Sequence, residues 1–219
     1  MVDLRLYALL DPERAGGAEL AQLGRKVVEG GATLVQLRDK HGSTRRLMAE
    51  TRAIKAALEP AGVPVLVNDR VDVALAAGAD GVHVGQDDMP AEEARRLLGP
   101  AAIIGLSIKT IAQAEAAPLD ALDYVCVGGV FATMSKDNPD APIGLAGLKT
   151  ILAVLRARAD KFPVGAIAGI DERNADAVVA AGADGIAVIS ALSLAPDPAA
   201  AARRLREIVD RGLGARGGA

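Results

Sequence analysis

Three polar side chains occupy alternate positions at the end of a short apolar run. Gln36, Arg38 and Lys40 stand where the run 34–37 gives way to charged residues. Because successive side chains of a strand point to opposite faces, Gln36 and Arg38 share one face. A guanidinium binds two phosphate oxygens at once, and an ammonium acts as a point charge. The pattern therefore fits an anion-binding strand end, although a solvated strand end would carry the same residue types.

Polar residues and glycine also follow later apolar runs of the chain. In order, they are Asn68, Asp69, Asp88, Ser107, Thr133, Ser135, Lys136, Gly169 and Ser190. The fixed cations Arg38, Lys40 and Lys136 together balance most of the charge of a diphosphate. A glycine at the end of a late strand lets a phosphate approach the backbone closely, so a second, singly phosphorylated ligand is also expected.

Two carboxylates in this set would repel such an anion unless a cation lay between them. Mg²⁺ prefers oxygen ligands and commonly takes one or two carboxylates together with substrate phosphates. We therefore expect Asp69 and Asp88 to bind Mg²⁺, although either aspartate alone could instead cap the helix that follows it.

Apolar, β-branched runs alternate with Ala-rich and charged stretches along the chain, which is typical of strand–helix units around a parallel sheet. The predicted strands are 4–9, 33–37, 64–67, 81–84, 103–106, 124–127, 164–167 and 185–189. The predicted helices are 19–29, 44–58, 71–77, 90–98, 111–116, 145–159, 172–181 and 198–211. These pairs predict a single-domain α/β fold, a (βα)₈ TIM barrel over residues 1–211, with a flexible Gly-rich tail over 212–219. Because the carboxyl ends of all barrel strands meet at one mouth, this fold would bring the polar residues together.

A short motif repeats before two of the predicted strands. Residues 77–82 read AGADGV and residues 181–186 read AGADGI. Each motif places a glycine where a helix ends and an aspartate in the turn before the next strand. We expect Asp80 and Asp184 to be turn residues on the face opposite the mouth.

Composition limits the classes of partner. Of 219 residues, 51% are hydrophobic and only 2% aromatic, so the core must consist of Ala, Val, Leu and Ile. The net charge of −3 gives no general attraction for nucleic acid or for an anionic membrane. No leader and no apolar run of about 18 residues is visible, so we expect a cytoplasmic protein acting on small molecules. The oligomeric state is open, and a homo-oligomer is compatible with the sequence. The single cysteine, Cys126, is expected to be a small core residue. His83 is expected to point inward and fill the barrel interior, with a substrate contact as the alternative, and His41 is expected at the surface.

Taken together, these stretches resemble the thiamine phosphate synthase family. The similar runs are 35–40 (VQLRDK), 67–70 (VNDR), 81–88 (GVHVGQDD), 105–107 (GLS), 127–136 (VGGVFATMSK), 166–170 (AIAGI) and 181–191. The resemblance implies a (βα)₈ transferase that joins hydroxymethylpyrimidine diphosphate to a thiazole phosphate and releases pyrophosphate. It implies ionisation of the pyrimidine C–O bond, followed by capture of the carbocation by the thiazole nitrogen.

The resemblance also implies residue roles. The pyrimidine diphosphate would be held by Gln36, Arg38, Lys40, Asn68, Ser107 and Lys136, of which Arg38, Ser107 and Lys136 would be catalytic. The thiazole phosphate would be surrounded by Thr133, Ser135, Gly169, Ile189 and Ser190. Asp69 and Asp88 would bind Mg²⁺ as the cofactor. The chain departs from the family pattern at Gly129, Lys109, Ala132 and Ala168, where Pro, His, Pro and Gly are usual.

Three alternatives share parts of this pattern. A thiazole tautomerase-like relative would carry a histidine in the motif 127–130, which has none. Another phosphate-binding TIM-barrel isomerase or epimerase would need a pair of proton-transferring groups, for which only Asp69, Asp88 and His83 are available. A phosphate-binding barrel without catalytic activity would lack the metal pair or Lys136, and the sequence contains all of them.

Overall fold

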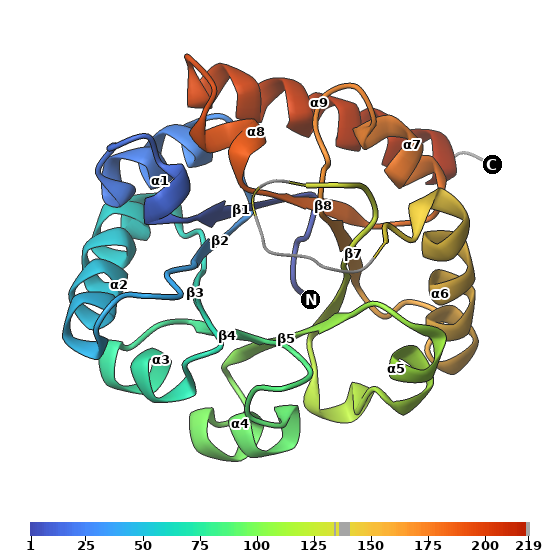
Figure 1. The fold of residues 1–219 in the computed structure, drawn as a ribbon, viewed down its shortest axis with the longest axis horizontal. Coiled ribbons are helices and arrows are strands. Elements are labelled where there is room, and N and C mark those ends of the chain that lie inside the picture. The colour runs from blue at the N-terminus through green and yellow to red at the C-terminus, as the bar shows by residue number, and fades with distance from the viewer. Residues whose placement is uncertain (134, 136–140, 218–219) are drawn as a thin grey trace.

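The fold is a closed barrel of eight parallel strands surrounded by helices, as a computed structural model describes for residues 1–133, 135 and 141–217 (Figure 1). Each strand pairs with the next in the chain, and β8 closes the ring against β1. The strands are β1 Leu6–Leu10, β2 Leu34–Leu37, β3 Val65–Asn68, β4 Gly81–Val84, β5 Ile103–Ile108, β6 Tyr124–Val127, β7 Val164–Ile167 and β8 Gly185–Val188. The predicted (βα)₈ fold is confirmed.

Helices connect the strands and cover the outside of the barrel. They are α1 Leu20–Glu29, α2 Thr44–Leu58, α3 Val71–Ala77, α4 Ala91–Leu98, α5 Ile111–Ala116, α6 Gly144–Arg158, α7 Ala175–Ala180, α8 Ser190–Ser193 and α9 Pro198–Gly217. Single 3₁₀ turns lie at Pro12–Arg14, Glu59–Ala61 and Leu119–Ala121. Of the described helices, none has the length and apolar character needed to span a membrane.

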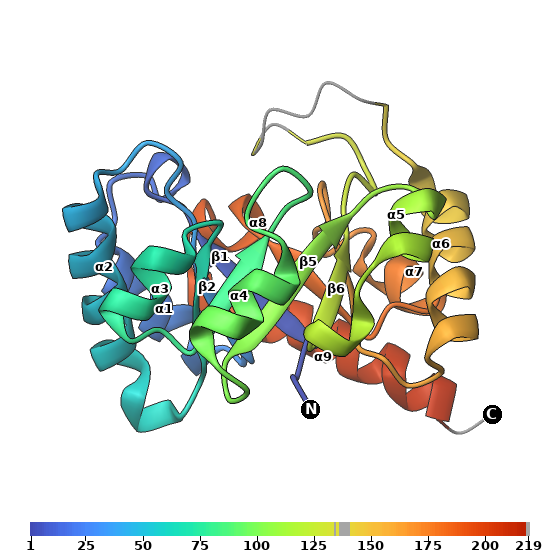
Figure 2. The ribbon, with the colours of Figure 1, turned by 90° about the horizontal axis from the view of Figure 1, so that it is seen from below.

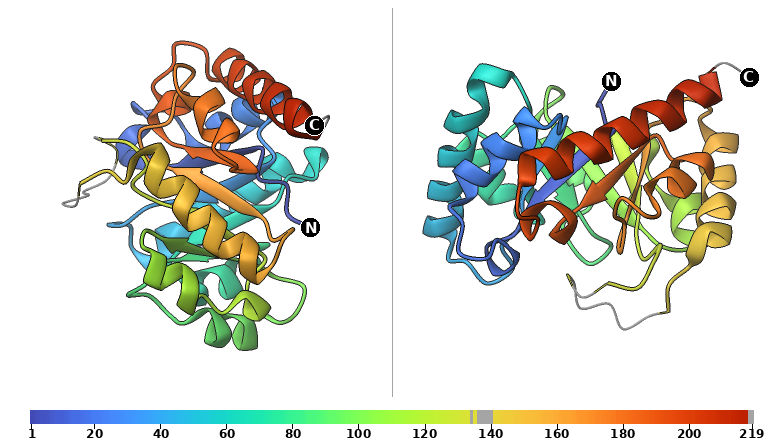
Figure 3. Two further views of the ribbon diagram at one scale, coloured as in Figure 1. Left: turned by 90° about the vertical axis from the view of Figure 1, so that its right-hand side faces the viewer. Right: turned by 90° about the horizontal axis from the view of Figure 1, so that it is seen from above.

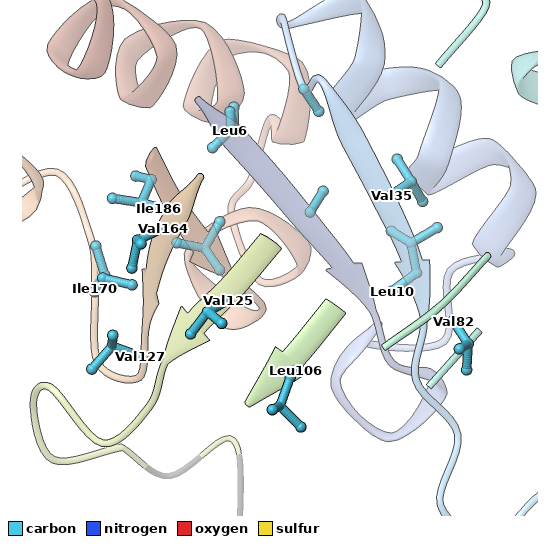
Figure 4. Close-up of a cluster of buried hydrophobic side chains, with 14 of the residues drawn as sticks. Leu6, Leu10, Val35, Val82, Leu106, Val125, Val127, Val164, Ile170 and Ile186 are labelled. Atoms are coloured by element: carbon cyan, nitrogen blue, oxygen red, sulfur yellow. The ribbon is translucent and has the colours of Figure 1, made fainter. Parts of the chain in front are cut away.

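Successive residues of each strand belong to different parts of the core. The outward side chains, such as Leu6, Leu10 and Val35, lie between the strands and the helices (Figure 4). The inward side chains form a second, smaller cluster inside the barrel, which comprises Leu4, Tyr7, Leu9, Leu34, Leu66, Tyr124, Cys126, Ile167, Ala187 and Ile189. Both tyrosines of the sequence therefore lie in the barrel interior.

Aspartates fix the turns that lead into β4 and β8. Asp80 accepts a hydrogen bond from the Val65 N–H at 2.8 Å and pairs with Lys55. Asp184 repeats this contact with the Val164 N–H at 2.9 Å. Each carboxylate thus ties the start of one strand to the turn before the next, at the amino ends of the strands. The prediction that these aspartates belong to the scaffold is confirmed.

The C-terminal helix is longer than the sequence pattern predicts. The pattern ends the helix at Arg211 and predicts a flexible tail over 212–219, whereas α9 continues to Gly217. A Cβ on Gly212 would lie 2.8 Å from Val179 Cγ1, so this glycine lets α9 pack closely on α7. Arg216 also donates to the Ala183 carbonyl at 2.7 Å. Figure 3 shows α9 along the outside of the barrel, beside α1 and α7. Residues 218–219 lie outside the described part of the chain.

Two further boundaries differ at the mouth. The predicted helix 172–181 begins only at Ala175, because Asn174 Oδ1 and Asp171 Oδ1 accept the N–H groups of Asp171 and Arg173 in a turn. The predicted strand 103–106 continues to Ile108, which places Ser107 within β5. The four-residue α8 was not predicted, since helices this short have no periodic pattern.

Candidate active site

Two adjoining cavities open at the carboxyl ends of the strands. The β2–β5 cavity, of about 310 Å³, is lined by Tyr7, Leu9, Gln36, Arg38, Lys40, Asn68, Asp69, His83, Gly85, Gln86, Asp87, Asp88, Ser107, Cys126 and Ile167. The β7–β8 cavity, of about 460 Å³, is lined by Arg14, Ala132, Thr133, Ser135, Ile167, Ala168, Gly169, Ile170, Asp171, Arg173, Ala187, Val188, Ile189, Ser190, Ala191 and Leu194. Ile167 belongs to both walls, so the cavities adjoin. In Figure 2 the strand ends that carry them point away from the N-terminus.

A larger cavity, of about 900 Å³, lies near the amino ends of β3 and β5. Its charged residues Lys55 and Asp80 pair with each other at 2.6 Å, and Arg52 donates to the Ala76 carbonyl. These groups hold the scaffold together, so size alone does not mark this cavity as the functional site.

The structure brings Gln36, Arg38 and Lys40 to the β2–β5 cavity, as the strand alternation predicts. Arg38 has a partner that the sequence analysis missed: its guanidinium pairs with Asp11, directly after β1. The Arg38 and Asp11 side chains are only 12% and 3% exposed, so Arg38 is held by a nearly buried ion pair. Asp11 could have been found by applying the strand-end rule to the first strand as well.

Asp69 and Asp88 lie together in the same cavity. Burial raises the pKa of the Asp69 carboxyl, Lys40 lowers it, and the neighbouring Asp88 raises it, which leaves the pKa above its usual value. Asp88 also accepts the Gly85 N–H at 2.7 Å. Asp69 has a φ of 62°, a left-handed conformation that L-residues rarely adopt. Two interacting carboxylates beside open space fit Mg²⁺, which would neutralise their repulsion.

A chain of hydrogen bonds forms the floor of the β2–β5 cavity. Gln36 Nε2 donates to Tyr7 Oη, and the Tyr7 and Tyr124 hydroxyls lie 2.9 Å apart. His83 Nδ1 lies 2.8 Å from Tyr124 Oη, and His83 Nε2 lies 2.8 Å from Ser107 Oγ. Burial raises the pKa of both phenols far above the ordinary value, so both hydroxyls stay protonated. The inward position of His83 agrees with the prediction, and the role of the tyrosines was missed.

The β7–β8 cavity gathers the residues expected around the second phosphate. Thr133, Ser135, Gly169, Ile189 and Ser190 all line it. Ser135 Oγ donates to Ser190 Oγ at 2.9 Å, and the Ser135 N–H donates to Thr133 Oγ1 at 3.1 Å. Gly169 has a φ of 65°, and a Cβ there would lie 2.4 Å from the Ala132 carbonyl oxygen. The prediction for Lys136 falls outside the described residues.

Two arginines line this cavity although the sequence analysis did not single them out. Arg14 comes from the 3₁₀ turn after β1, and Arg173 follows β7. Arg173 forms an ion pair with Asp171 at 2.5 Å that lowers the pKa of that carboxyl. Arg14 is partly buried and brings a positive charge to a wall whose other charged side chains, Asp171 and Arg173, pair with each other.

Comparison with known proteins assigns the chain to a family. A sequence model described as thiamine monophosphate synthase matches residues 6–192. The chain belongs to this family. It is 53% identical to the thiamine-phosphate synthase of Agrobacterium fabrum over 215 residues, which cover 98% of each protein. It is 48% identical to the thiamine-phosphate synthase of Moorella thermoacetica over 209 residues, or 95% of this chain and 97% of that protein.

A solved structure from the same family has the same fold as this chain. The thiamine phosphate pyrophosphorylase from Pyrococcus furiosus superimposes with a TM-score of 0.84 at 38% identity, covering 97% of this chain and 98% of that one. The resemblance inferred from the motifs is thereby confirmed over nearly the whole chain, and the alternatives of a tautomerase or an isomerase are not favoured.

Proposed function

We propose that this chain forms thiamine phosphate from hydroxymethylpyrimidine diphosphate and thiazole phosphate, with release of pyrophosphate. The observation that carries this proposal is the pair of adjoining cavities. One cavity presents cations and two carboxylates, as a diphosphate with Mg²⁺ requires, and the other presents hydroxyls, a glycine and Arg14. Since Ile167 belongs to both walls, the two substrates would meet at that side chain.

Arg38 and Lys40 would bind the diphosphate of the first substrate. The ion pair with Asp11 fixes the Arg38 guanidinium before the substrate arrives, so little conformational entropy is lost on binding. Lys40 pairs with Asp69, which keeps its ammonium beside the carboxylates that would hold the metal. Asp69 and Asp88 would bind Mg²⁺, which when bound supplies positive charge that stabilises the departing diphosphate. Lys136 would add a further cation, as the family resemblance implies.

The substitution needs no nucleophilic side chain. The C–O bond between the pyrimidine methylene and the diphosphate breaks, and the electron pair leaves with the diphosphate. The thiazole nitrogen then donates its lone pair to the methylene carbocation and forms the C–N bond. Leu9, Cys126 and Ile167 give the cavity apolar surface that limits the access of water to the cation. Ser107 would donate a hydrogen bond to the diphosphate from the cavity floor.

The proposal is tested by incubating the chain with both phosphorylated precursors and Mg²⁺. We expect pyrophosphate and thiamine phosphate in equal amounts, loss of turnover with EDTA, and recovery when Mg²⁺ is added back. No product under conditions in which a known synthase is active would refute the proposal. Thiazole phosphate alone tests the tautomerase alternative. A cytoplasmic location and a homo-oligomer stay predictions.

A further inference from the structure

We propose that Tyr7, Tyr124 and His83 are positioning residues that couple the orientation of the Gln36 amide to the hydrogen-bond direction of the Ser107 hydroxyl. These five residues, here called the floor chain, connect two ends that both line the β2–β5 cavity. The proposal rests on the proposed function for the identity of the ligand. Its new content is that Gln36 and Ser107 act on that ligand as one unit.

The number of protons on the three central groups couples Gln36 to Ser107. Each phenol hydroxyl has one proton, and a neutral imidazole carries one N–H, so each of the three central groups donates one hydrogen bond along the chain and accepts one. The positions of hydroxyl protons and the histidine tautomer are free to adjust to the network. Once the donor is chosen at one contact, every other contact of the floor chain is therefore determined.

In the first of two directions, the Gln36 N–H donates to Tyr7. In this direction the Tyr7 hydroxyl rotates so that its proton points to Tyr124 Oη, which lies 2.9 Å away and acts as the acceptor. Tyr124 then donates to His83 Nδ1, and the His83 Nε2–H donates to Ser107 Oγ. This direction leaves the Ser107 proton available to donate into the cavity, together with the Gln36 carbonyl oxygen as an acceptor.

In the second direction, every donor becomes an acceptor. The Gln36 carbonyl oxygen accepts from Tyr7, and Ser107 donates to His83 Nε2. Gln36 then presents only its N–H groups to the cavity, and Ser107 presents only lone pairs. The two ends therefore always have opposite character, one a donor and the other an acceptor.

The ligand chemistry selects the first direction. Diphosphate oxygens accept hydrogen bonds, so they favour a donating Ser107 and are repelled by its lone pairs. Gln36 Oε1 is buried and has no hydrogen-bond partner among the described residues, so it needs a donor. The exocyclic amino group of an aminopyrimidine is such a donor. An amino group at one end and a diphosphate at the other thus satisfy the same direction of the floor chain.

Packing holds the floor chain in place. The His83 and Tyr124 rings stack with centroids 5.5 Å apart, and the Tyr7 and Tyr124 rings meet edge to face at 5.8 Å. A Cβ on Gly105 would lie 2.1 Å from Tyr124 Cζ, so β5 leaves room for this ring. The hydroxyls are therefore preorganised, and binding would change proton positions without moving the rings.

The test compares the aminopyrimidine diphosphate with its oxo analogue, in which a carbonyl replaces the amino group. Tyr124→Phe keeps the ring but breaks the floor chain at its centre. We expect kcat/KM for the amino substrate to fall about tenfold or more, and the preference for amino over oxo substrate to fall with it. Tyr7→Phe should have the same effect, and the double variant should lose no more than either single one. Leu34→Val, also inside the barrel, controls for stability and should keep the preference.

A second measurement determines directly which His83 nitrogen carries the proton. The chain has two histidines, and ¹⁵N labelling with a His41→Gln variant assigns the His83 signals. With the aminopyrimidine diphosphate bound, we expect His83 to carry its proton on Nε2. A proton on Nδ1 in that complex, or an unchanged preference in Tyr124→Phe, would overturn the proposal. An active wild-type chain with either result refutes only the floor chain, whereas an inactive wild-type chain refutes the proposed function.

Discussion

Ala168 occupies a backbone conformation that suits glycine. It directly follows β7, has a φ of 93°, and lines the β7–β8 cavity. The resemblance to the thiamine phosphate synthase family implies glycine at this position. Because an L-residue at this φ brings its Cβ into conflict with the backbone, Ala168→Gly should make the protein more stable.

The magnitude follows from two opposing contributions. Relief of the left-handed strain contributes about 2 kcal/mol. The greater freedom of glycine in the unfolded chain costs about 0.7 kcal/mol. Ala168 is buried but belongs to neither hydrophobic core cluster, so the lost methyl costs about 0.3 kcal/mol. The free energy of unfolding should therefore rise by about 1 kcal/mol, or about 2–4 °C in Tm for a domain of this size.

Thermal and urea unfolding measure this change, and Ala166→Gly is the matched control. Ala166 lies in β7, shortly before Ala168, with a fully buried methyl and no positive φ, so its glycine variant should be destabilised by about 1.5 kcal/mol. An Ala168→Gly protein that is no more stable than the wild type would show that the surrounding backbone does not hold Ala168 under strain.

Three further predictions concern the proposed ligand-binding groups. Arg38→Met should abolish most activity. It should also lower the free energy of unfolding by about 3 kcal/mol, because the Asp11 carboxylate stays buried without its partner. Adding Asp11→Asn should restore stability in urea unfolding but not turnover. Arg14→Ala should raise KM for thiazole phosphate about tenfold in steady-state assays, with KM for the pyrimidine substrate unchanged. Asp88→Asn should raise the half-saturating Mg²⁺ concentration at least tenfold in a metal titration, with Tm unchanged within 2 °C.

The barrel and most of the mouth were predictable because their signals are local. Strand runs, glycine-terminated helices and turn aspartates such as Asp80 recur along the chain, and the (βα)₈ fold then gathers the strand ends at one place. The floor chain was not predictable in this way. Tyr7 and Tyr124 are 117 positions apart, and only the closed barrel brings their hydroxyls to 2.9 Å.

The Arg38 site shows the same limit for charged groups. The alternation in β2 correctly places Arg38 at the mouth, and from the sequence its guanidinium looks free for a ligand. The structure instead pairs it with Asp11, so we expect substitution of Arg38 to affect stability as well as the proposed ligand binding. Partners across a barrel are determined by register between neighbouring strands, here β1 and β2, which a single sequence does not encode locally.

The two tyrosines also explain how an aliphatic barrel can have a polar floor. A barrel interior filled only by Leu and Val would seal the cavity, but it would leave the Gln36 N–H and the Ser107 hydroxyl without partners on the buried side. Gly105 leaves the space in which the Tyr124 ring lies, and the ring carries its hydroxyl to His83. Gly105→Ala should therefore displace the Tyr124 ring and weaken the amino preference together with stability, whereas Tyr124→Phe should weaken the preference with only a small loss of stability.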